Sequence, residues 1–121
     1  MIEIKLIPEN EFQRVREANI DTYARLALIA DMCSANALAT VKRAGSGHLG
    51  SSLSCLGVVT YLYHYELNIA QLGVNHPDRD IFFSSKGHDV PGHYAVLHSL
   101  GLLAEEQFQH LRRLNGTHGH P

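Results

Sequence analysis

Residues 44–52 (AGSGHLGSS) combine a single histidine with residue types that suit a bound anion. Glycine has no Cβ and tolerates positive φ, so the glycines at 45, 47 and 50 let the backbone approach a ligand closely. Ser51 and Ser52 follow where the N-cap of a helix is expected, and the free N–H groups of a helix N-terminus favour phosphate. The spacing matches neither a P-loop nor Gly-x-Gly-x-x-Gly. A glycine-rich turn between helices, without any ligand, is the competing interpretation.

Histidine is the one residue type present in unusual number, with nine in 121 residues. Three of them, His48, His88 and His120, each follow a glycine in a predicted loop at the end of a regular element. Because imidazole titrates near neutral pH, such a group can bind the hydroxyls of a polar ligand or move protons. The other six are expected at surface or half-buried positions, with His64 at the edge of the core and His76 in a solvated turn.

Zinc binding and nucleophilic catalysis are the competing chemistries for these side chains. His118 and His120 form a His-x-His pair that could chelate a metal, and His93 and His98 lie five residues apart. No Cys-x-x-Cys or His-Glu-x-x-His pattern supplies further ligands, and no Ser or Cys stands in a Gly-x-Ser-x-Gly elbow. We therefore predict no metal ligands in this chain.

The composition is that of one globular domain, with 45% apolar and 18% charged residues. A formal charge of −2 and scattered basic residues give no reason to expect a nucleic-acid partner. Cys33 and Cys55 lie in apolar helical patterns and are predicted to be free, buried thiols. No signal peptide is recognised, and no uninterrupted apolar stretch approaches the roughly 18 residues that a membrane span needs. A cytoplasmic location and no membrane partner are therefore expected.

Two long helical patterns flank the glycine-rich segment. Residues 11–43 follow the three-and-four spacing of a helix, with a predicted break at 19–21 where Asp21 could cap the second piece. The alanine-rich face of this pattern predicts close packing against another helix. Residues 53–68 form a second helix that is apolar around most of its circumference, which predicts burial on several sides.

His88 is expected just after a strand. Residues 69–80 are predicted to be a loop, and residues 81–85 (IFFSS) are the one strand candidate, which needs partners elsewhere to form a sheet. Ligands bind at the carboxyl ends of strands in open α/β sheets, which is where His88 would stand. A helix is predicted at 91–100, with Asp89 as its cap, and a shorter one at 105–114. Gly101 is the expected stop of the former.

Three motifs, taken in order, resemble the start of transketolase. They are SGHLG at 46–50, DRDIFFSSKGH at 78–88 and GHP at 119–121, and the resemblance covers residues 12–121. Leu49, where the family commonly has proline, and Lys86 are similar to the split transketolases, in which this domain is a separate N-terminal subunit. Deoxyxylulose-phosphate synthase is related but less similar around His88.

The resemblance implies an α/β fold: the N-terminal part of a thiamin-diphosphate-binding fold, mostly helical here, with one short parallel-sheet strand. It implies a transferase of carbohydrate metabolism, which moves a two-carbon ketol unit between sugar phosphates with thiamin diphosphate and Mg²⁺ or Ca²⁺. On the matching positions, Gly87 and His88 would bind the cofactor's diphosphate. His48 and His120 would be catalytic, binding donor-sugar hydroxyls and assisting proton transfer.

Parts of the family's machinery have no counterpart in these 121 residues. The family holds its metal with Gly-Asp-Gly and a later Asn, and a glutamate from another domain activates the cofactor. We therefore expect residues 1–121 to be the N-terminal portion of a cofactor domain, apparently truncated and inactive alone. A homodimer with a separate C-terminal subunit is the implied assembly. The alternative is a non-catalytic remnant that binds an anion or a partner protein through the glycine-rich loop.

Overall fold

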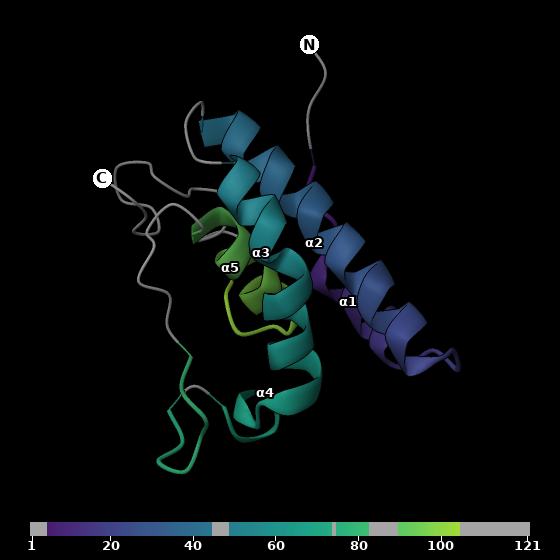
Figure 1. Ribbon diagram of the computed structural model, residues 1–121, viewed down its shortest axis with the longest axis vertical. Coiled ribbons are helices and arrows are strands. Elements are labelled where there is room, and N and C mark those ends of the chain that lie inside the picture. The colour runs from purple at the N-terminus through teal and green to yellow at the C-terminus, as the bar shows by residue number, and fades with distance from the viewer. Residues whose placement is uncertain (1–4, 45–48, 74, 83–89, 105–121) are drawn as a thin grey trace.

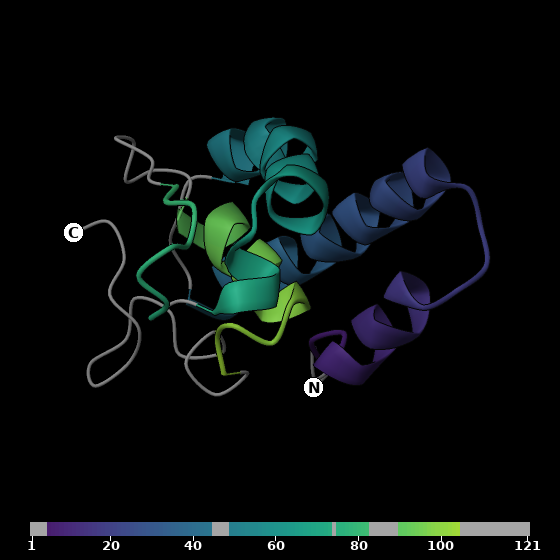
Figure 2. The same ribbon diagram turned by 90° about the horizontal axis from the view of Figure 1, so that it is seen from below.

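The computed structural model describes residues 5–44, 49–73, 75–82 and 90–104, and these residues are mostly helical. Three helices, α2, α3 and α5, pack against one another, and α1 runs beside α2 (Figures 1 and 2). The elements in chain order are α1 (Glu9–Arg16), α2 (Thr22–Ala44), α3 (Leu49–Tyr61), the π-helix η1 (Leu62–Glu66), α4 (Ile69–Leu72) and α5 (Val90–Ser99).

The core lies where α2, α3 and α5 meet. Small buried residues on α2 and α5, among them Cys33, Ala37 and Ala95, allow the helix backbones to approach closely. Larger apolar side chains fill the space around them, and the fully buried ones include Phe12, Ile29, Leu56 and Val96. The predicted alanine face of α2 is only partly buried, because Ala24, Ala27 and Ala35 are exposed.

The predicted break between the first two helices is confirmed, and so is its cap. Asp21 Oδ2 accepts hydrogen bonds from the backbone N–H groups of Tyr23 and Ala24, each at 3.1 Å. These donors belong to the first turn of α2 and have no acceptor within the helix, which is why an aspartate is favoured here. Arg25 closes the same turn by donating from one terminal nitrogen to the carbonyls of Ala18 and Ile20.

A buried amide ties the N-terminal arm to α2. Asn36 accepts a hydrogen bond from the Ile7 N–H at 2.7 Å and donates one to the Ile7 carbonyl at 3.0 Å. Asn36 is 1% exposed, so these two bonds satisfy a side chain that would otherwise be costly to bury.

The second long helix differs from its prediction in three ways. It begins at Leu49, so Ser51 and Ser52 lie in its first turn and not at its cap. It buries one side only, because Val58 and Tyr65 are 64% and 52% exposed. Its last turn widens into η1, where the Leu67 N–H donates to the Leu62 carbonyl five residues back.

The segment between η1 and α5 also departs from the sequence prediction. Residues 69–72, predicted as loop, form the single turn α4. Ile81 and Phe82 are not in a strand, and the rest of that predicted strand lies outside the described residues. No strand occurs in the part of the chain that the structure describes, so the expected parallel strand stays unconfirmed. The predicted Asp89 cap and the 105–114 helix also lie outside it.

The predicted stop of α5 is confirmed. Gly101 has φ of +75°, and its N–H donates to the His98 carbonyl while the Leu102 N–H donates to the Leu97 carbonyl. This pair of bonds is the Schellman arrangement, which needs the left-handed conformation that glycine adopts without strain.

By length and hydropathy, Thr22–Lys42 could cross a membrane, with a mean hydropathy of 1.2 over its most apolar window. Arg25 and Asp31 interrupt this stretch, so it is not an uninterrupted apolar run. Core helices of soluble proteins pass the same test, and 33% of the window is buried inside the bundle.

The Asp21 cap gives a direct test of the fold. We expect Asp21→Ala to lower the free energy of unfolding by about 1 kcal/mol, because two first-turn N–H groups of α2 lose their acceptor. Urea unfolding followed by circular dichroism measures this change. Asp31→Ala, an exposed aspartate inside the same helix, is the matched control and should be neutral or slightly stabilising. An equal loss in both variants would contradict the capping role.

Candidate functional site

The four predicted site residues, His48, Gly87, His88 and His120, lie outside the described residues. The structure does describe the helices next to them in the chain. Residues 45–48 join α2 to α3, and residues 83–89 lead directly into α5. The starts of α3 and α5 lie at the same end of the three-helix group in both views (Figures 1 and 2). Two helix N-termini, whose first-turn N–H groups have no acceptor within their own helix, are therefore held at one end of the bundle.

An aromatic cluster fixes the chain just before residues 83–89. Phe82 packs edge-on against the rings of Tyr63 and His93, with centroid distances of 5.6 and 5.1 Å. The Tyr63 hydroxyl and His93 Nε2 are hydrogen-bonded at 3.0 Å. Because Tyr63 belongs to η1 and His93 to α5, the cluster anchors the end of the DRDIF segment to both elements.

The acidic residues at the start of that segment are structural. The Asn68 N–H donates to Asp80 Oδ2 at 2.9 Å, and the Asp80 N–H donates back to Asn68 Oδ1 at 2.5 Å. Asn68 also donates to the Asp78 carbonyl, and Arg79 donates to the His76 carbonyl. This clamp holds the 75–80 turn against the start of α4. The family motif at 78–88 and the predicted turn around His76 do not reveal these contacts.

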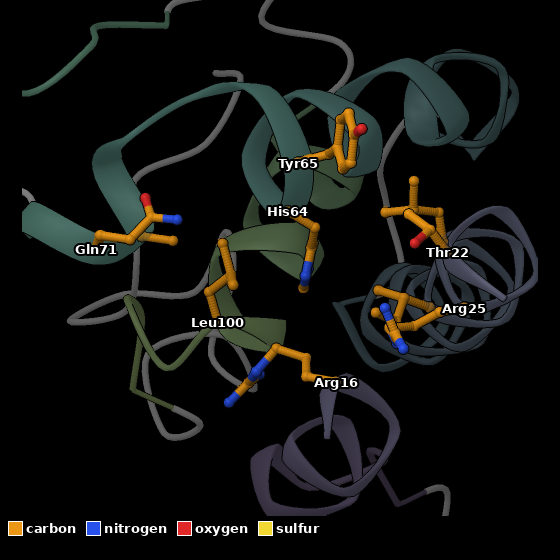
Figure 3. A pocket seen from close by; sticks show the side chains of 10 residues that line it. Arg16, Thr22, Arg25, His64, Tyr65, Gln71 and Leu100 are labelled. Atoms are coloured by element: carbon orange, nitrogen blue, oxygen red, sulfur yellow. The ribbon is translucent and has the colours of Figure 1, made fainter. Parts of the chain in front are cut away.

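A pocket of about 330 Å³ lies at the other end of the bundle. It is formed where the end of α1, the start of α2, η1, α4 and the end of α5 come together (Figure 3). Its lining is Arg16, Thr22, Arg25, Leu26, Ile29, His64, Tyr65, Ala70, Gln71 and Leu100. It was not predicted, because its residues come from five elements and follow no sequence spacing.

The charge of this pocket comes from its two arginines. Arg16 donates to the Ser99 carbonyl and forms an ion pair with Glu9 at 2.8 Å. Arg25 donates only to the backbone carbonyls of Ala18 and Ile20, and it has no carboxylate partner among the described residues. No carboxylate lines the pocket, so it carries a net positive charge.

His64 projects from η1 toward the space between the two arginines (Figure 3). Its Nε2 lies 2.8 Å from Ser99 Oγ, which itself donates to the Val96 carbonyl. Since the Ser99 proton is used there, Nε2 carries the proton of the neutral ring and donates to Ser99, leaving Nδ1 unprotonated. Burial, and then the positive charge of Arg16, lower the pKa of His64 from 6.5 to about 4. The predicted place of His64 at the core edge is confirmed.

The described residues contain no group of three or more side chains that could hold a metal ion. His93 and His98 pack against different rings, His93 on Phe82 and His98 on Phe12. His98 is fully buried, so its predicted surface or half-buried position is wrong. His118 and His120, the predicted chelating pair, lie outside the described residues.

The predicted free thiols are confirmed, although Cys55 is only half-buried. Burial raises the pKa of Cys33 to about 12, which makes it an unreactive core residue.

Comparison with known families identifies the class of protein. The family described as "Transketolase, thiamine diphosphate binding domain" matches residues 26–121, and the chain belongs to this family. The resemblance seen in the three sequence motifs is thereby confirmed.

Among similar proteins, transketolase-like protein 2 of Mus musculus is 30% identical over 84% of this chain. Human transketolase is 35% identical over 64% of the chain, and one subunit of the apulose-4-phosphate transketolase of Phocaeicola vulgatus is 35% identical over 67%. The chain spans 16%, 13% and 29% of these relatives, respectively. No solved structure matches the chain significantly.

The lowered pKa of His64 predicts acid sensitivity of the fold. The unfolded chain binds a proton at this residue near pH 6.5, whereas the folded chain binds it only near pH 4. Stability from His64 is therefore complete above pH 6.5 and is lost as the pH falls toward 4. The difference corresponds to at most about 3 kcal/mol. Urea unfolding at pH 7.5 and at pH 4.5 measures this loss.

Two variants separate this effect from general acid denaturation. We expect His64→Gln to flatten the dependence between pH 6.5 and 4, because glutamine does not titrate. His76→Gln, in the 75–80 turn, controls for the removal of a histidine as such and should keep the dependence of the parent chain. An unchanged pH dependence in His64→Gln would contradict the assignment.

Proposed function

We propose that the chain is the N-terminal segment of a thiamin-diphosphate-dependent transketolase subunit that transfers a two-carbon ketol unit between sugar phosphates. The observation that carries the proposal is the family match over residues 26–121. The three histidine motifs support it, since they stand in the family's order within that range.

The arrangement of α3 and α5 suits the diphosphate of this cofactor. Both helices begin at one end of the bundle, and helix N-termini favour anions through free N–H groups and the helix dipole. Gly87 precedes His88 just before α5, where a missing Cβ leaves room for a phosphate and an imidazole can donate to it. The cofactor, when bound, would supply the carbon nucleophile of the transfer.

His48 and His120 are proposed to work on the sugar. A neutral imidazole both donates and accepts hydrogen bonds, so each ring can bind a donor hydroxyl and move its proton. His48 directly precedes α3, which places it in the chain next to one of the two helix N-termini.

Further residues are required to complete the proposed site. The metal, Mg²⁺ or Ca²⁺, would be held by Gly-Asp-Gly and Asn residues that are not among these 121 residues. We therefore propose that the segment is inactive alone. Two similar proteins are named as single subunits of an apulose-4-phosphate transketolase, which supports a separate C-terminal subunit here. Homodimerisation, and a cytoplasmic location in keeping with two free cysteines, complete the proposal.

The second candidate is a non-catalytic remnant that binds an anion or a partner protein through the glycine-rich loop. No observation on the described residues favours it. The two proposals differ in whether the complete protein binds thiamin diphosphate in a metal-dependent way.

Cofactor binding tests the role of His88. In the complete enzyme we expect His88→Ala to weaken thiamin diphosphate binding about 10- to 100-fold, the effect of losing a hydrogen bond to a charged group. Isothermal titration calorimetry with Mg²⁺ present measures this change. His76→Ala, a histidine within the 75–80 turn, is the control and should bind normally. An unchanged cofactor affinity in His88→Ala would count against the proposed site.

His120 is expected to affect a different step. His120→Ala should keep the cofactor affinity and lower turnover about 10²-fold or more, because it removes a group that positions the sugar and moves a proton. Steady-state transfer from a ketose phosphate to an aldose phosphate gives kcat and KM separately. A variant that loses cofactor affinity and keeps its turnover at saturating cofactor would overturn this assignment.

A further inference from the structure

The pocket between Arg16, Arg25 and His64 lies at the end of the bundle opposite the starts of α3 and α5, which follow the residues proposed to bind the sugar and the cofactor in the chain. Thr22, at its edge, begins α2, and residues 45–48 follow the other end of that helix. At 1.5 Å per residue, α2 is roughly 33 Å long. The proposed transketolase chemistry therefore gives this pocket no role, and the residues that line it indicate what it can bind.

An uncompensated charge is the main chemical feature of this pocket. Arg25 is half-buried, its Nε is fully covered without an acceptor, and its charge faces no carboxylate among the described residues. Removing a charge from water without a counterion is unfavourable, so an anion beside Arg25 would stabilise it. Asp21 is the acidic residue closest to Arg25 in the sequence, and its carboxylate accepts from the first-turn N–H groups of α2.

The other titratable groups around the pocket reinforce this preference. Arg16 comes from α1 with its charge paired to Glu9, and η1 contributes His64 and Tyr65. The α4 residues Ala70 and Gln71 and the α5 end residue Leu100 add no charge. His64 has a bare Nδ1, because its other nitrogen donates to Ser99. That nitrogen can take a proton from solvent and donate it to a bound anion.

The size of the pocket favours a molecule larger than a bare anion. Its volume of about 330 Å³ lies at the small end of the range for small-molecule sites. Thr22, Tyr65 and Gln71 offer hydrogen-bonding groups beside the positive end, and Leu26 and Ile29 form an apolar wall. Such a lining suits a short hydroxyl-bearing chain that ends in a phosphate.

We propose that this pocket binds a small phosphate monoester of a hydroxylated molecule, with its phosphate held by Arg16, Arg25 and His64. Arginine is suited to this task because its planar guanidinium donates to two phosphate oxygens at once. Binding takes up a proton on His64 Nδ1, so the ligand raises the pKa of His64. The site is separate from the proposed cofactor site, and the proposal does not depend on the transketolase function.

Nuclear magnetic resonance on the 121-residue chain tests the proposal without any substitution. Titration with glycerol 3-phosphate should shift the His64 ring and Gln71 side-chain signals to saturation, and the pKa of His64 should rise. Glycerol should leave these signals in place, and inorganic phosphate should bind at least about tenfold more weakly. Equal affinity for inorganic phosphate would overturn the assignment to a monoester. No shift of either residue would overturn the site itself.

Two arginine variants locate the binding charge. Arg25→Gln should weaken glycerol 3-phosphate binding about tenfold or more, as expected for losing a charged hydrogen-bond donor. Arg14→Gln is the matched control on α1, since Arg14 is 76% exposed and pairs with Glu11 away from the pocket. Shifts at His48, His88 and His120, with the affinity unaffected by Arg25→Gln, would place the ligand at the proposed cofactor end and overturn the proposal.

Discussion

The meeting point of α2, α3 and α5 around Cys33 is the constraint on which the rest of the structure depends. The Cys33 thiol donates to the Ala95 carbonyl of α5 at 3.8 Å. The side chains of Ser99 and Thr60 lower the pKa of this thiol by less than burial raises it. A larger or charged side chain could not occupy this position, because the residue is fully buried where three backbones converge. The raised pKa keeps the thiol neutral, so it acts as a small apolar filler. The packing of α2, α3 and α5 around Cys33 therefore positions the helix ends on both sides of the bundle.

Local signals predicted the break between α1 and α2 and the end of α5. Asp21 and Gly101 could be recognised because a cap or a left-handed residue has a chemical requirement that few residue types meet. Only residues 45–48 of the glycine-rich segment separate the two helices, and Ser51 and Ser52 are wrongly predicted at the cap because serine is a strong capping residue. Propensity could not reveal that the helix begins at Leu49, four residues before its predicted start.

Contacts between residues that are far apart in the chain could not be predicted from the sequence. The Asn68–Asp80 clamp, the Tyr63–Phe82–His93 cluster and the pocket around Arg25 all join residues whose proximity is set by packing. The transketolase family could be predicted because its motifs are contiguous strings of residues. The roles of His48, His88 and His120 stay predictions, because those residues lie outside the described part of the chain.

The bundle separates two kinds of surface along its length. One end presents the starts of α3 and α5, where backbone N–H groups and the helix dipoles provide the positive potential. The other end gathers side-chain charge from α1 and α2 around a neutral histidine. A backbone N–H is lost only when proline replaces the residue, whereas a pocket built from side chains can change by many single mutations. The first end is therefore fixed by the fold, and the second is free to vary among relatives that share it.

The π-helix at Leu62–Glu66 has a consequence for chain length. A π turn holds one more residue than an α turn, so η1 is equivalent to a single inserted residue at the end of α3. Without that residue, everything after it would turn by about 100° around the helix axis. Tyr63 and His64 now face α5 and the pocket, while Asn68 meets Asp80. All three alignments depend on the same extra residue, so the spacing between α3 and α4 is constrained even where the individual residue types are not.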